Sequence, residues 1–210
     1  MKIALALMVG FATVSLSGCS TPAPSVTQKQ VASAEAQDAQ RLFAGLTVDI
    51  DLMPSPDALF KTAEVAVRAE IIGATWGRTW YLMGPDMPST RTIMIRASVL
   101  EVVAGDSVEV GDVVYFENWV ADGASPEAFE TVLKGREAAL FLSPATADNS
   151  KGNLPDPTEG APAGAIIWNT GAQGFAVTAG DSQVVWPQLG DFANGTITDA
   201  LPGGTLIPKG

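Results

Sequence analysis

The feature that most limits how this chain can fold is a series of short segments in which apolar and polar residues alternate. A period of two is typical of a β-strand with one buried face. The segments expected to be strands are 46–51, 63–82, 90–103, 113–119, 136–143, 165–171, 173–180 and 182–188. Seven or eight strands at this spacing predict a mainly β fold, either a small antiparallel barrel or, as the alternative, a β-sandwich.

One or two short helices are expected between the strands. Segments 55–64 and 125–135 each begin with Ser-Pro, which places a capping residue before a proline suited to the first helical position. A length of 210 residues predicts one domain, and residues 46–190 carry the strand pattern. Residues 191–210 show no period and are expected to form a C-terminal tail.

Composition excludes several classes of function. The net charge of −11 repels phosphate backbones, so we expect no nucleic acid among the partners. The chain contains no histidine, so Ser-His-Asp and Cys-His catalytic arrangements are impossible within it. Its single cysteine excludes an intrachain disulfide and a thiolate zinc site. Known catalytic and nucleotide-binding motifs are also missing, and we expect neither a cofactor nor a metal.

The first eighteen residues have the pattern of an export signal. Lys2 precedes an apolar run at 3–16, and small residues follow it. The run is shorter than the roughly 20 residues that span a membrane comfortably. Residues 1–18 are therefore predicted to be a signal peptide rather than a membrane span.

The end of this segment, Leu16-Ser17-Gly18-Cys19, resembles the lipobox of bacterial lipoproteins. The resemblance implies that the Cys19 thiol receives a diacylglycerol and that the chain is cut before it. The alternative is an ordinary secretory signal with an incidental cysteine. Two or three acyl chains would hold the protein on a membrane, since each buried CH₂ contributes about 0.8 kcal/mol. We therefore expect an anchor on the extracytoplasmic face of the cell membrane, or on the outer membrane where there are two.

Residues 19–45 are predicted to be a flexible tether. Their first part is rich in Ser, Thr, Pro and Gln and is too polar to form a core. Their second part could form a short helix that Gly45 ends. Most of its apolar residues are alanines, so only Leu42, Phe43 and Leu46 are expected to dock on the domain.

The order of the strand-like phrases resembles that of secreted OB-like barrels of the netrin-module or tissue-inhibitor-of-metalloproteinase type. The phrases that carry the resemblance are AEVAVRAEIIGA (63–74), TIMIRASVLEVVAGDSVEVGDVVYF (92–116), GREAALFLS (135–143) and GAQGFAVTAGDSQVV (171–185). The resemblance implies an OB-like barrel. Protease inhibition is not implied, because this chain lacks the disulfides of the animal members. Their inhibitory members use an N-terminal cysteine against a catalytic metal, whereas acylation would occupy the sulfur of Cys19.

The aromatic stretch 75–82 holds the candidate ligand-binding residues, Trp76, Arg78, Trp80 and Tyr81. In a regular strand Trp76, Arg78 and Trp80 share one face, where aromatic rings beside an arginine could stack on a ligand or a sugar ring. The alternative is that the tryptophans cover one end of the barrel. Gly73 and Gly77 leave open a loop, which would change which side chains face together.

Other polar groups suggest sites less strongly. Asp49 and Asp51 lie two apart on one predicted strand face, where a solvated surface competes with a cation or acid–base site. The loop residues Asp148, Asn149, Asn153, Asp156 and Glu159 do not have EF-hand spacing, and a surface loop is expected. Asn194-Gly195-Thr196 matches a glycosylation sequon in form only.

These features favour a non-enzymatic lipoprotein whose β domain binds an envelope protein or glycan. A carboxylate-based envelope hydrolase and a structural envelope spacer are the alternatives. An exposed cluster of Trp76, Arg78 and Trp80 in a concave surface would indicate binding. Two carboxylates converging in a cleft about 5–9.5 Å apart would indicate hydrolysis.

Overall fold

The structure, a computed structural model, describes residues 31–81, 89–121, 123–145 and 154–209. Residues 32–210 form one compact unit, which contains every helix and strand of the described residues. The predicted signal peptide, Cys19 and the first part of the tether lie outside the described residues. Among the described residues, no helix has the length and apolar character needed to cross a membrane.

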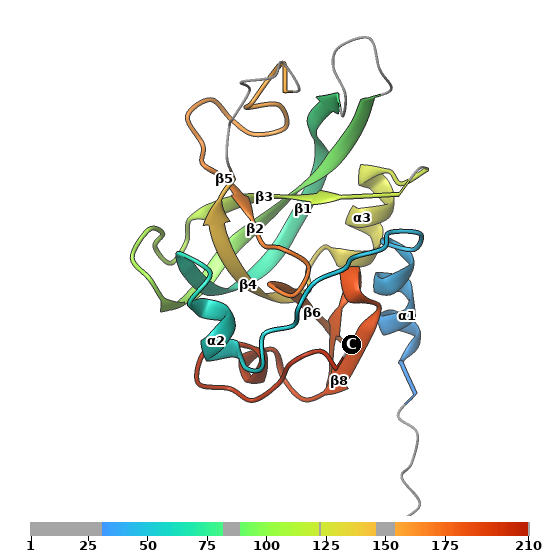
Figure 1. Cartoon of the computed structure of the whole chain (residues 1–210), viewed down its shortest axis with the longest axis vertical. Coiled ribbons are helices and arrows are strands. Elements are labelled where there is room, and N and C mark those ends of the chain that lie inside the picture. The colour runs from blue at the N-terminus through green and yellow to red at the C-terminus, as the bar shows by residue number, and fades with distance from the viewer. Residues whose placement is uncertain (1–30, 82–88, 122, 146–153, 210) are drawn as a thin grey trace, which may run out of the picture. The chain divides into compact units, whose positions relative to one another are not determined.

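This unit is mainly β, as the alternation predicts, and is built on one eight-stranded sheet (Figure 1). The strands are β1 (Val65–Tyr81), β2 (Ser89–Ala104), β3 (Val113–Trp119), β4 (Glu137–Pro144), β5 (Ile167–Asn169), β6 (Phe175–Ala179), β7 (Gln183–Trp186) and β8 (Asp191–Asn194). Five of them close a ring in the order β1-β2-β3-β5-β4, because β4 also pairs with β1.

The sheet is mixed, which corrects the expected antiparallel arrangement. β5 runs parallel to β3, with Phe116 opposite Trp168. The chain between these two strands passes through a helix and through β4, which runs antiparallel to β5 and to β1. This return path brings β5 beside β3 in the same direction, as a crossover connection allows and a hairpin does not.

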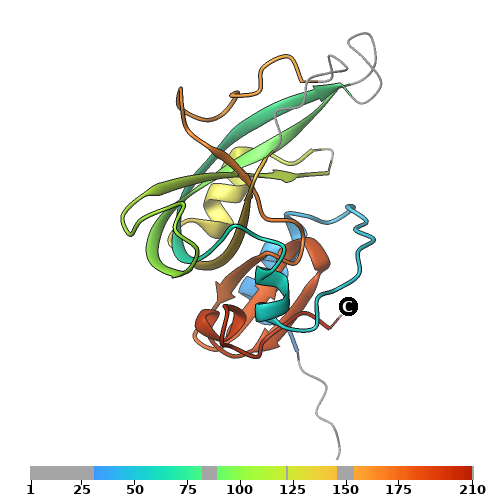
Figure 2. The same cartoon turned by 60° about the vertical axis from the view of Figure 1, so that its left-hand side comes forward.

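Strands β6, β7 and β8 extend the sheet from β4 below the ring (Figure 2). This extension includes residues that were predicted to form a tail after residue 190. Asp191–Asn194 pairs with β7, and the following 3₁₀ helix η2 (Ile197–Ala200) is fixed by a capping box between Thr196 and Asp199. The tail prediction is wrong because Ile197, Ala200 and Leu201 are buried in a second core cluster, although their spacing shows no period.

Three α-helices accompany the sheet in the described part of the chain, α1 (Ala34–Arg41), α2 (Pro56–Phe60) and α3 (Pro126–Leu133), and a 3₁₀ helix η1 spans Pro187–Leu189. The serines predicted to cap α2 and α3 do so. Ser55 accepts a hydrogen bond from the Ala58 N–H and Ser125 from the Ala128 N–H. Proline follows each of these serines at the first helical position.

The main core lies between the ring and helices α1 and α3. Phe43, which follows α1, contacts Phe129 of α3 and Phe175 of β6, with ring centroids 5.2 and 6.3 Å apart. Ala36 and Ala39 of α1 are fully buried, since a small side chain lets the helix approach the sheet closely. The helix predicted in the tether therefore exists, but residues 32–45 belong to the folded unit rather than to a spacer.

Residues 46–53, predicted in part as a strand, form an extended segment that pairs with none of the described strands. We call this segment the strap. Apolar and polar residues alternate along the strap, but they do not give it one buried face, because Ile50 is exposed. The Gln173 side chain holds the strap, because its amide accepts from the Met53 N–H at 2.8 Å and donates to the Met53 carbonyl at 2.9 Å.

Candidate functional site

A bulge in β1 decides which of the predicted site residues meet. Trp76 lies opposite Ile93 of β2, but the next pair is Thr79 with Arg91, so β1 contributes one residue more than β2. An extra residue reverses the side to which later side chains point. Trp76 therefore lies apart from Arg78 and Trp80, and the prediction that all three share one face is wrong.

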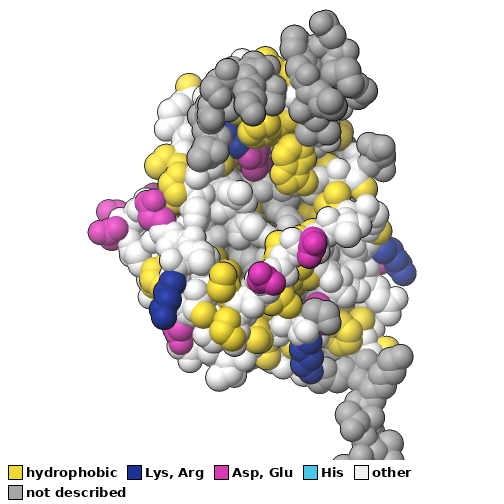
Figure 3. Space-filling view, in the orientation of Figure 1, with side chains coloured by type: hydrophobic (Ala, Val, Ile, Leu, Met, Phe, Trp, Pro, Cys, Tyr) yellow, Lys and Arg dark blue, Asp and Glu magenta, His cyan; other side chains and the backbone are white. Residues whose placement is uncertain are grey.

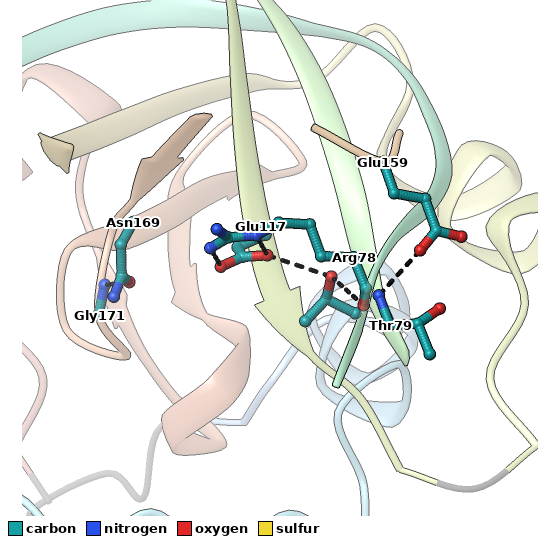
Figure 4. A network of polar contacts seen from close by, with 7 residues as sticks. Arg78, Thr79, Glu117, Glu159, Asn169 and Gly171 are labelled. Atoms are coloured by element: carbon teal, nitrogen blue, oxygen red, sulfur yellow. Dashed lines mark hydrogen bonds and ion pairs between the residues drawn. The ribbon is translucent and has the colours of Figure 1, made fainter. Parts of the chain in front are cut away.

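Arg78 forms a buried ion pair with Glu117 of β3 (Figure 4). The arginine is only 1% exposed. Its Nε donates to Glu117 Oε2 at 2.8 Å and its second nitrogen, Nη2, donates to Oε1, which makes the contact bidentate. The Thr92 hydroxyl lies 3.3 Å from the same Oε2. Arg78 is thus a buried structural charge rather than an exposed ligand contact.

Trp80 packs on this ion pair, and Trp119 packs in turn on Trp80. The Trp80 ring lies 5.0 Å from the Arg78 guanidinium and 5.8 Å from the ring of Trp119, which ends β3. The Trp80 indole nitrogen is buried and has no hydrogen-bond partner in the described part of the chain. Trp119 is 45% exposed and is the aromatic side chain of this group most open to solvent.

A second ion pair lies on the other side of β1 and includes the remaining tryptophan. Arg91 contacts Glu159 at 2.6 Å and lies 4.9 Å from the Trp76 ring. Glu159 also accepts from the Thr79 N–H at 2.9 Å, within the bulge (Figure 4). The segment between β4 and β5 is therefore attached to β1 and β2 through one carboxylate.

Asp156 prepares the turn that presents Glu159. Its Oδ1 accepts from both the Thr158 N–H and the Thr158 hydroxyl at 2.8 Å. The backbone hydrogen bond, and then the hydroxyl, lower the pKa of the Asp156 carboxyl below its ordinary value. The Asp156 carboxylate thus stabilises a local turn through its Oδ1.

A cavity of about 400 Å³ lies at the C-terminal end of β3. Figure 3 shows this face hollowed near its centre, with hydrophobic and acidic side chains around the hollow. The strap and the turn after β5 form the other walls. The cavity is lined by Leu46, Thr47, Val48, Asp49, Glu117, Asn118, Trp119, Asn169, Gly171, Ala172 and Gln188.

Asn118 is the most buried polar residue of this cavity. It is 2% exposed, and its Oδ1 accepts from the Gln188 amide. Its side-chain nitrogen has no hydrogen-bond partner within the described residues. An unsatisfied buried amide costs about 1–3 kcal/mol, and this side chain lies on the same face of β3 as Phe116, opposite to that of Trp119.

The other predicted candidates are dispersed. Asp49 lines this cavity, whereas Asp51 lines a second cavity of about 250 Å³ beyond the strap. Tyr81 ends β1 half-buried, and Asn194 is exposed at the end of β8. Asp148, Asn149 and Asn153 lie outside the described residues. Within the described ranges no cluster of acidic side chains is arranged to hold a metal.

Sequence reasoning missed Glu117, Trp119, Asn118 and Gln188. One signal was available, because Glu117 interrupts an apolar strand between Phe116 and Trp119, and a charge in such a strand needs a partner. The cavity itself depends on the strap, and no pattern in the sequence places that segment beside β3.

The geometry thus places an aromatic face, amide groups and a carboxylate around one hollow. Comparisons with models of known protein families, with curated proteins and with solved structures find no match for this chain.

Proposed function

We propose that this protein is a lipid-anchored extracytoplasmic lipoprotein whose folded unit is a non-catalytic binding module for a component of the cell envelope. The anchor proposal is supported by the Leu16–Cys19 lipobox and by the position of the only cysteine. The binding proposal is carried by one observation, the exposed Trp119 at the rim of a 400 Å³ cavity whose walls carry both polar and apolar side chains.

We further propose that the five-stranded ring is an OB-like barrel. The strand order β1-β2-β3-β5-β4-β1 closes the ring, and α3 joins β3 to β4 and packs against β1. A closed five-stranded ring with non-sequential strand order agrees with a Greek-key barrel of that type. Strands β6 to β8 would then be an addition to the barrel rather than part of it.

The chemistry of the cavity favours binding over hydrolysis. A hydrolase of the carboxylate type needs one acid free to donate a proton and a second carboxylate opposite it. Glu117 is engaged through both oxygens by Arg78, and Asp49 lies on the exposed strap. With no histidine in the chain, the residues around the hollow are better suited to hold a ligand than to transfer protons.

Replacement of the proposed acylation site tests the anchor. In Cys19→Ala we expect no lipid on the chain and loss of the cleaved, membrane-bound form, because the thiol that takes the diacylglycerol is gone. Metabolic labelling with a fatty acid and fractionation of membranes measure both effects. A variant that is still cut and still fractionates fully with membranes contradicts the anchor.

Replacement of the exposed tryptophans tests the binding surface. The wild-type chain is used to capture envelope components, and Trp119→Ala is expected to lower their recovery at least tenfold, because it removes the aromatic wall of the cavity. Trp76→Ala is the matched control, since this tryptophan is 37% exposed but lies outside the cavity. Equal recovery with Trp119→Ala and with wild type would exclude this cavity as the binding surface.

A further inference from the structure

We propose that the cavity beside Trp119 binds an uncharged pyranose sugar of an envelope glycan, with the ring stacked on the indole and its hydroxyl groups bonded to the amides and to Asp49. This assignment rests on the proposed binding function and adds the chemical class of the ligand.

The charge of the residues that line the cavity limits the class of ligand more than the shape of the cavity does. No Lys or Arg of the described residues lines the cavity, so a phosphate, sulfate or uronate would meet no cation in this lining. Glu117 is already neutralised by Arg78 at its back. Asp49 is the other carboxylate of this described lining, and it lies on the exposed strap. The walls therefore disfavour anions, and the exposed carboxylate of Asp49 offers a cation only a weak, solvent-screened attraction.

The hydrogen-bonding groups of the cavity wall also favour a sugar. A sugar hydroxyl both donates and accepts, so it suits a wall that carries donors and acceptors close together. Asp49 supplies acceptor oxygens, and Thr47, Asn169 and Gln188 supply groups of both kinds. An apolar ligand would take these groups out of water without offering them a partner.

The indole of Trp119 offers a stacking surface for a sugar ring. A pyranose ring has a face that carries mainly C–H groups, and this face packs against an indole as other apolar surfaces do. Trp119 is 45% exposed, and Trp80 supports it from behind at 5.8 Å. An indole held in this way gives a stacking surface with little loss of side-chain freedom on binding.

The size of the cavity agrees with a ligand of this kind. Sites for small molecules usually enclose about 300–1,000 Å³, and this cavity has about 400 Å³. Leu46 and Val48 of the strap add apolar contacts at the wall that faces β3. The site is thus suited to one or a few sugar rings of a longer chain rather than to a large folded partner.

Titration with trisaccharides of defined charge tests the assignment. The full-length chain, in a detergent without a sugar headgroup, is titrated by calorimetry with neutral chitotriose, cellotriose and maltotriose. The anionic and cationic comparisons are trigalacturonate and triglucosamine. We expect at least one neutral trisaccharide to bind at least tenfold more tightly than both charged ones.

Variants then place the sugar in the cavity. Trp119→Ala is expected to weaken binding at least tenfold, and Trp119→Phe to keep it within about threefold, because phenylalanine retains an aromatic face. Asp49→Ala should also weaken binding, because it removes acceptor oxygens from the wall of the cavity. Trp76→Ala should leave the affinity unchanged.

Other results overturn the assignment in distinct ways. Preferential binding of trigalacturonate or triglucosamine shows that the ligand class is wrong, as does neutral-sugar binding that is equal in wild type and Trp119→Ala. If no trisaccharide binds but capture of envelope components still depends on Trp119, the sugar assignment fails and the binding module stands. If capture does not depend on Trp119, the proposed binding surface fails as well.

Discussion

A buried guanidinium is the most demanding single group in this fold. Moving an arginine out of water costs several kcal/mol, and this cost is recovered only when a carboxylate meets it with good geometry. Glu117 supplies both oxygens, and Thr92 supports one of them with its hydroxyl. The pair fixes β1 against β3 at the end of the ring, directly behind the cavity wall.

Replacing one or both partners of the Arg78–Glu117 pair tests how much the buried charge costs. Glu117→Leu should lower the free energy of unfolding by about 3–5 kcal/mol, because the buried guanidinium loses its carboxylate. The double variant Arg78→Met, Glu117→Leu should recover most of that loss, since an apolar pair of similar volume needs no compensation. Urea unfolding followed by tryptophan fluorescence measures all three proteins. A double variant no more stable than Glu117→Leu would mean that the unpaired charge of Arg78 does not cause the loss of stability.

At the scale of elements, the segment 154–165 is attached to the β1–β2 hairpin by its backbone as well as by Glu159. Gly160 adopts a φ of +88°, and a Cβ built on it would lie 2.4 Å from the Trp76 carbonyl oxygen. The Thr75 hydroxyl lies 3.4 Å from the Gly160 carbonyl. Only glycine lets the two backbones approach this closely.

Two glycines of this segment provide a matched pair. Gly164 has a similar φ of +82° but open space around its Cβ position, so Gly164→Ala should cost only the left-handed strain of about 1–2 kcal/mol. Gly160→Ala should cost about 1–3 kcal/mol more, because the added methyl also meets the β1 backbone. Denaturant midpoints compare the two variants directly. Equal costs would show that the segment moves away from β1 without penalty.

The elements show where prediction from sequence succeeds and where it stops. Strands and helix caps follow from local patterns, so β1 to β4 and the Ser55 and Ser125 caps were predictable. The bulge after Trp76 was not, because it depends on the register between β1 and β2. Neither was the course of the strap, whose alternation looks like a strand but whose position depends on Gln173, 120 residues from Met53 along the chain.

Only part of the candidate site was predictable from the sequence. The pattern around residue 78 indicated an aromatic and arginine cluster, and Arg78 and Trp80 do contact each other. Their partners Glu117 and Trp119 come from β3, 39 residues further along the chain in each case, and only the folded ring brings them together. The cavity needs a third element, the strap, so no local pattern in the chain could place it.

At the scale of the whole unit, the boundary of the fold lies well before the first strand. Ala36, Ala39 and Phe43 belong to the same core cluster as the ring, and Phe43 packs between Phe129 and Phe175. Ser33 also reaches β7, because its N–H donates to the Gln183 side chain at 2.9 Å. Residues 32–45 thus act as a component of the core, and any tether must end before them.

Truncation distinguishes these two roles of the N-terminal residues. A chain of residues 32–210 should unfold at the same temperature as the longer protein, because the core is intact. A chain of residues 46–210 should fail to fold cooperatively. Loss of Phe43 alone is expected to cost about 3–5 kcal/mol, a large part of the roughly 5–15 kcal/mol that stabilises a typical domain. Calorimetry of both chains measures the difference. If the shorter chain melts as sharply and at the same temperature, α1 is only an appendage, and the tether extends to residue 45 as the sequence pattern indicates.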